Sequence, residues 1–99
     1  MPTLVLPSMV AGRDLADALV ERLAGDLTGT EVVVDCRRLV SASPSFAAQL
    51  VLRLLVDRRA GSLEVEHAPA AFGTYLQQAA RRIGVADRLH VSAREPAPA

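Results

Sequence analysis

The sequence contains no lysine and no tryptophan, and it has few aromatic residues of any kind. Aromatic residues make up 3% of the 99 positions whereas apolar residues reach 51%, so the core must be built from Ala, Val and Leu. This much apolar area can offset the entropy lost when a chain becomes ordered. The composition therefore argues against disorder and suits one compact α/β domain with a single core.

Net charge is also lacking, because 11 basic residues, all of them arginine, balance 11 acidic residues. Without a positive field, and with almost no aromatic side chains to stack on bases, the chain is not expected to bind nucleic acid. The doublets Arg58-Arg59 and Arg81-Arg82 fall near expected helix ends, where cations suit the helix dipole. We interpret these doublets as structural.

Long apolar runs are missing too, since none approaches the roughly 20 residues needed to span a bilayer. The N-terminus lacks the basic segment of a signal peptide. The single cysteine, Cys36, cannot form an internal disulfide, which favours a reducing compartment. We therefore expect a cytoplasmic protein that does not insert into membranes.

Cys36, His67 and His90 could suggest a cysteine nucleophile or a metal site. Neither histidine lies in a recognisable motif, and no close pair of metal ligands exists. A lone cysteine after a run of valines is more typical of a small core residue. We expect no enzymatic activity, no cofactor and no metal.

The spacing of apolar residues alternates along the chain between the period of a strand and that of a helix. The run Val32 to Val34 predicts a strand covered on both faces, as are the central strands of α/β sheets. In the last expected helix Ile83 falls on the inward stripe, and Gly84 ends the helix. In chain order we expect strand 3–7, helix 13–27, strand 31–36, helix 44–59, strand 62–67, helix 70–84 and a short strand near 89–91.

This order predicts a single small α/β domain with a mostly parallel four-stranded sheet and three to four helices. We expect the domain to span residues 1–92 and residues 93–99 to form a flexible C-terminal tail. A short first strand would leave one sheet edge open, which would permit a homodimer.

Residues 41–50, SASPSFAAQL, follow the valine strand and open the second helix. Pro44 suits the first helical position, where its missing N–H is not needed, which makes Ser43 the expected N-cap. Ser45 then lies at the second helical position, where unpaired N–H groups and the positive end of the dipole favour a phosphate. Two interpretations stay open: the serines only cap the helix, or Ser45 is a phosphate switch.

The stretches GRDLADALVERL, VVVDCRRLVSASPSFAAQL and RRIGVADRLHV together resemble the STAS domain superfamily, which includes anti-sigma-factor antagonists. They are most similar to the STAS-like domains of unknown function. The resemblance covers residues 12–91, is most specific over residues 35–50, and implies a STAS-like fold.

In the antagonists, the turn from strand to helix contains Asp-Ser-Ser-Gly, and a partner anti-sigma kinase phosphorylates the second serine. That partner binds only the unphosphorylated form. Placing Asp35 on the strand-end aspartate of the family puts Ser45 at the phosphorylated serine. Here Ser43, Pro44 and Phe46 stand where the family has Asp, Ser and Gly.

The resemblance implies a non-enzymatic regulatory module that binds a protein partner, a histidine-kinase-type ATPase or anti-sigma factor, and is switched by phosphorylation of Ser45. One alternative is an unphosphorylated STAS-like scaffold subunit of a larger complex, and a third is a small enzyme that uses Cys36. The partner-binding surface implied by the resemblance comprises Asp35, Arg37, Arg38, Ser41, Ser43, Pro44, Ser45 and Gln49.

Overall fold

Four short apolar segments pair into one sheet in the computed structural model, which describes residues 2–93. All pairs in this sheet are parallel, and the strand order is β1-β3-β5-β6. The expected α/β class with a four-stranded parallel sheet is thereby confirmed. The strands are β1 (Thr3–Val5), β3 (Glu31–Asp35), β5 (Ser62–Ala68) and β6 (Leu89–Ala93).

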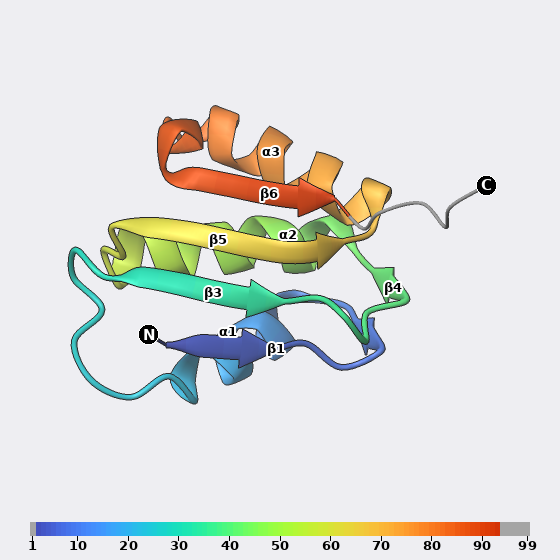
Figure 1. Ribbon diagram of the computed structural model, residues 1–99, viewed down its shortest axis with the longest axis horizontal. Helices are drawn as coiled ribbons and strands as arrows, with labels where there is room; N and C mark the ends of the chain where they lie inside the picture. Colours follow the sequence, from blue (N-terminus) through green and yellow to red (C-terminus); the bar gives the residue numbers. More distant parts are fainter. Residues whose placement is uncertain (1, 94–99) are drawn as a thin grey trace.

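Three helices connect these strands, and all of them lie on the same face of the sheet (Figure 1). Each connection adds the next strand on the same side of the previous one, so crossovers of one hand place every helix on one face. The helices are α1 (Arg13–Glu21), α2 (Pro44–Val51) and α3 (Ala70–Arg82). A wider π-helical segment, η1 (Leu52–Asp57), continues α2, and a short 3-10 turn, η2 (Ala86–Arg88), precedes β6.

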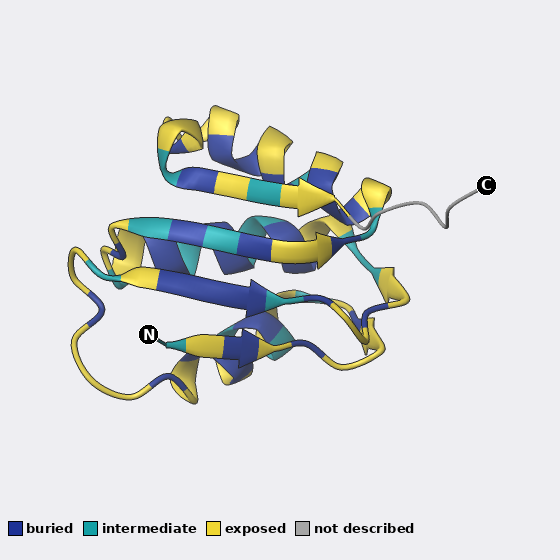
Figure 2. Cartoon of the chain, viewed as in Figure 1, coloured by how far each residue is buried: buried dark blue, intermediate teal, exposed yellow. Residues whose placement is uncertain are grey.

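The core lies between this helical layer and one face of the sheet. Val32 and Val34 of β3 are fully buried, and so are Phe46 of α2 and Phe72 of α3, whose ring centroids are 6.2 Å apart. The expected burial of Val32 to Val34 is confirmed, but helices cover only one of the two faces of β3. On the open face Val33 is buried, and its register partners in the neighbouring strands are Thr3 and Glu64. Most of β3 is coloured as buried in Figure 2.

Two helix ends also differ from the sequence-based expectation. The first helix ends at Glu21 instead of near residue 27, although Leu23 and Leu27 are still buried in the core. Ile83, expected to point inward, is 41% exposed, because its φ of −108° and ψ of 7° take it off the helical path. Gly84 follows with a φ of 78°, the left-handed conformation that commonly ends a helix.

A second, two-stranded parallel sheet, which the apolar pattern did not predict, lies beyond the carboxyl ends of the main strands. It pairs β2 (Met9–Val10) with β4 (Ser41–Ala42). At the other boundary Ala93 belongs to β6, so the tail expected from residue 93 starts inside a strand, and its other residues, 94–99, lie outside the described part. None of the helices within residues 2–93 is long and apolar enough to cross a membrane.

Candidate partner-binding site

The hydroxyl group of Ser43 joins the first turns of two helices. Ser43 is the N-cap of α2, and its Oγ accepts a hydrogen bond of 3.1 Å from the backbone N–H of Phe46. The same Oγ accepts a second bond of 3.1 Å from the backbone N–H of Gly12, the residue immediately before α1. The predicted cap is therefore present, and it also fixes the start of α1 against the start of α2.

Ser45 lies beside this cap, with its Oγ 3.1 Å from the Oγ of Ser43. Both acceptor lone pairs of Ser43 are used by amides, so the hydroxyl proton of Ser43 is the one available for this bond. Ser45 is exposed, whereas Ser43 is half-buried. Of the two serines, Ser45 therefore has the hydroxyl group that a modifying enzyme could reach.

Asp35 and Arg37 form a separate, self-contained turn at the carboxyl end of β3. The Asp35 Oδ1 accepts a hydrogen bond of 2.9 Å from the backbone N–H of Arg37, and Oδ2 lies 3.6 Å from the Arg37 Nη2. The Asp35 side chain is largely buried and that of Arg37 is exposed. Asp35 thus shapes the turn, and Arg37 presents its charge to solvent.

The remaining predicted residues lie at different depths around the serine turn. Ser41 and Pro44 are exposed, Ser41 in β4 and Pro44 at the first position of α2. Arg38 is exposed and borders a hollow of about 370 Å³ between β1 and α1. Gln49 lies one turn along α2, and its Nε2 donates a hydrogen bond of 2.8 Å to the Asp17 Oδ1. Gln49 therefore contributes to packing between α2 and α1.

Arg53 continues this contact between the two helices. Its guanidinium lies 2.8 Å from the Glu21 Oε1, 3.3 Å from the Asp17 Oδ1 and 3.0 Å from the Asp57 Oδ2. The i,i+4 spacing of Arg53 and Asp57 predicts this last contact. The hydrogen bond with Asp57, together with the nearby carboxylates, raises the pKa of Arg53. This arginine is held by the protein itself and is not available to a partner.

Two exposed apolar side chains, neither of them predicted from the sequence, flank the serine turn. Met9 is 72% exposed and Val40 is 75% exposed, the largest values among the exposed large apolar residues of the described chain. Met9 pairs with Ser41 in the small sheet, and the backbone N–H of Val40 donates to the Ser8 carbonyl at 2.7 Å. Met9 and Val40 each stand beside another apolar residue, and such short apolar pairs resemble strand fragments. The sequence pattern therefore did not indicate that these two side chains are exposed.

A hollow of about 380 Å³ opens next to these side chains. Met9, Leu15, Ser41 and Ser43 are among the residues that line it. The carboxyl end of the sheet therefore combines an exposed hydroxyl group, exposed apolar side chains and a shallow depression. This combination is typical of a surface that contacts another protein.

The alternative nucleophile and metal ligands do not form a site. Cys36 is fully buried in the hydrophobic core, which suits a structural residue better than a nucleophile. His90 is paired with Glu64, its Nδ1 lying 3.0 Å from the Glu64 Oε2, and His67 is exposed at the irregular end of β5. Across residues 2–93 there is no group of three side chains that could hold a metal ion.

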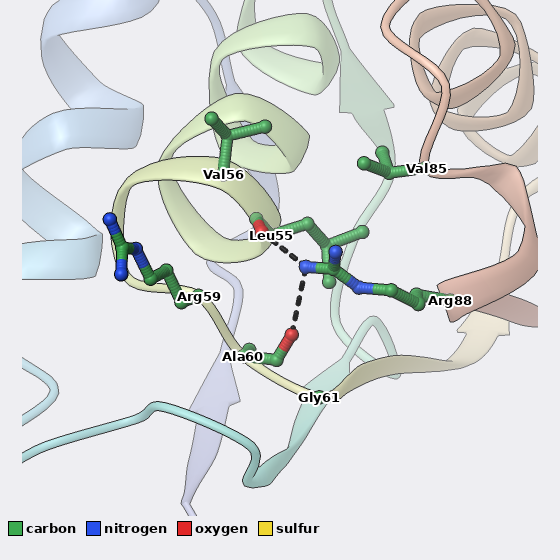
Figure 3. A pocket seen from close by; sticks show the side chains of 7 residues that line it. All are labelled: Leu55, Val56, Arg59, Ala60, Gly61, Val85 and Arg88. Carbon is green, nitrogen blue, oxygen red and sulfur yellow. Dashed lines mark hydrogen bonds between the residues drawn. The ribbon is translucent and has the colours of Figure 1, made fainter.

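A larger hollow, of about 570 Å³, lies at the opposite end of the molecule (Figure 3). The Arg88 side chain extends into this hollow, and its Nη2 donates hydrogen bonds to the carbonyl oxygens of Leu55 and Ala60, the latter at 3.0 Å. Val56 and Val85 stand over this guanidinium, and Arg59 points away from it (Figure 3). Arg88 thus ties the turn before β6 to the end of η1, which is a structural role.

No family model, curated protein or solved structure gives a significant match to this chain.

Proposed function

We propose that this chain is a non-enzymatic protein-interaction module whose partner docks on the serine turn and the start of α2. In this proposal phosphorylation of Ser45 controls the docking. The observation that carries it is the placement of an exposed Ser45 hydroxyl at a helix start close to the two most exposed large apolar side chains, Met9 and Val40.

A phosphate on Ser45 would be tolerated by the fold itself. It would lie at the N-terminus of α2, where backbone N–H groups and the helix dipole favour negative charge. The modification adds about −1.5 to −2 charges at pH 7 to a surface that now presents a neutral hydroxyl group. A partner that buries Met9 and Val40 would have to desolvate that charge, so docking would weaken while the fold persists.

The class of partner follows from the sequence resemblance to the STAS superfamily. That resemblance favours a histidine-kinase-type ATPase with anti-sigma activity, in the reducing environment that a lone cysteine suits. Pro44 and Phe46, which depart from the family turn, favour the scaffold alternative. Phe46 is core, however, so its size does not change the exposed surface.

The test compares Ser45→Ala and Ser45→Asp binding to a candidate ATPase, for example one encoded beside this protein, by calorimetry. We expect Ser45→Ala to bind like the unmodified protein and Ser45→Asp to bind at least about tenfold more weakly, a loss of about 1.4 kcal/mol. Met9→Asp is the matched variant, because it tests the apolar part of the surface without touching the serine. If both serine variants bind alike while Met9→Asp binds weakly, the chain is a scaffold and the switch is rejected.

A further inference from the structure

A groove on the outer surface of the helical layer starts one turn below Ser45. Ser45, Ala48, Gln49 and Leu52 follow the i, i+3, i+4, i+7 spacing that places residues on one face of a helix. The last three line the groove, together with Ala79 and Ile83 of the α3 end, and its volume is about 160 Å³. A volume of this size suits one or two apolar side chains.

The floor of the groove is apolar and its rims are basic. Ala48 and Leu52 are half-buried, Ala79 is buried, and Ile83 remains 41% exposed at the lip. Arg13, the first residue of α1, and Arg82, the last residue of α3, both line this groove.

The side chains of the two arginines at the groove have no partner among the described residues, a property that they share with Arg22 and Arg81. Neither Arg13 nor Arg82 makes a side-chain hydrogen bond or ion pair with another residue in the range 2–93. Arg53 in contrast contacts three carboxylates, and Arg58 is bonded to carbonyls at the end of α1. Two unpaired guanidinium groups beside an exposed isoleucine thus form a surface whose charge is not compensated internally.

We propose that this groove binds an acidic segment of a partner protein, with a large apolar side chain in the groove and carboxylates on Arg13 and Arg82. Charge complementarity selects this occupant, because a neutral apolar segment would leave both guanidinium groups unpaired at the rim. This proposal adds to the proposed function the chemistry of the segment that docks. It rests on the proposed function in one respect, which is that the molecule bound in the groove is a protein.

Phosphorylation of Ser45 would also affect binding in the groove. Gly12, next to Arg13, is bonded to the Ser43 hydroxyl, which is itself bonded to Ser45, so the start of α1 and Ser45 are held together. A phosphate on Ser45 would therefore add negative charge near the start of α1, where Arg13 lies. The phosphate would repel an acidic segment bound in the groove and would also neutralise the charge of Arg13.

The test titrates the full isotope-labelled protein with a synthetic peptide that has leucines at i, i+3 and i+7 and glutamates between them, followed by NMR. We expect shifts at the amides of Ala48, Leu52 and Ile83 and at the Nε–H signals of Arg13 and Arg82. A peptide with glutamine in place of glutamate should bind about tenfold more weakly.

Arg82→Glu should weaken binding of the glutamate peptide about tenfold, because it reverses one rim charge. Arg81→Glu is the matched control, since Arg81 is the neighbouring exposed arginine outside the groove, and it should change the affinity less than about twofold. Shifts confined to other surfaces, or none at millimolar peptide, would overturn the inference. Because neither variant alters Ser45, this result is independent of whether Ser45 is a switch.

Discussion

Ser43 and Ser45 are two residues apart, yet they have different roles because their hydroxyl groups have different partners. The Ser43 hydroxyl group accepts from two backbone N–H groups, whereas the Ser45 hydroxyl group has only that of Ser43 as a hydrogen-bond partner among the described residues. The cap interpretation and the switch interpretation of this stretch are therefore compatible. Ser43 holds the fold together, and Ser45 remains accessible.

Removing the Ser43 hydroxyl should destabilise the protein. Ser43→Ala leaves the N–H groups of Phe46 and Gly12 without their acceptor, so we expect the free energy of unfolding to fall by about 1–2 kcal/mol. Urea denaturation followed by circular dichroism measures this change. Ser45→Ala is the control and should stay within about 0.5 kcal/mol of the original protein. Equal losses for both variants would mean that Ser43 is not the cap.

Arg59 offers a stabilising substitution. Its φ is 56°, a left-handed conformation that glycine adopts without steric cost, and its side chain is exposed. Arg59→Gly should raise the free energy of unfolding by about 0.5–1 kcal/mol, because the strain removed exceeds the extra entropy of the unfolded chain. Thermal denaturation checks this, and a lowered midpoint would show that the Arg59 side chain stabilises the fold.

At the scale of elements, the end of α1 depends on an arginine far away in the sequence. The Arg58 Nη2 donates to the carbonyl oxygens of Leu23 and Gly25 at 2.8 and 3.0 Å, and Nη1 donates to that of Val20 at 3.3 Å. Val20 lies in the last turn of α1 and its carbonyl also accepts a bond of 3.0 Å from the backbone N–H of Leu23, whereas the Leu23 and Gly25 carbonyls belong to the loop that follows the helix. Arg58 therefore ties the last turn of α1 and the loop that follows it to the end of η1.

Arg58→Ala should expose these carbonyls and loosen the end of α1. We expect a loss of about 2 kcal/mol in the free energy of unfolding and faster hydrogen exchange near Leu23. Arg22→Ala is the comparison variant, because Arg22 lies at the same helix end but its side chain is exposed. Unchanged exchange at Leu23 in the Arg58 variant would contradict this account.

Some sequence patterns predicted the secondary-structure elements and their contacts, and others did not. Strand and helix order, the Ser43 cap with Pro44 after it, and the pair of Arg53 and Asp57 follow from local spacing, and the structure confirms them. The early end of α1 could not be predicted, because apolar Leu23 continues the helical pattern while its carbonyl is bonded to Arg58, which is far away in the sequence. The small sheet of β2 and β4 is too short for its pattern to be distinguished from loops.

At the scale of the whole molecule, the placement of all helices on one face of the sheet limits where a partner-binding surface can lie. All helices cover one face of the sheet. The exposed apolar side chains near Ser45 lie at the carboxyl ends of the strands, as Met9 and Val40 do, and on the outer helical surface, as Ile83 does. The sequence placed Asp35 and Ser45 at this end correctly. It could not identify Met9, Val40 or the Arg13–Arg82 groove, because these residues come together only through contacts across the fold.

The central claim, that Ser45 carries a phosphate switch, is tested most directly by intact-mass spectrometry with peptide mapping. The protein should be purified from its native cells with phosphatases inhibited, across several growth conditions. The account predicts a fraction of molecules with one added phosphate, localised to Ser45, and none on Ser43, whose oxygen is already fully bonded. A protein that stays unmodified in every condition, or that is phosphorylated on Ser43 instead, would contradict it.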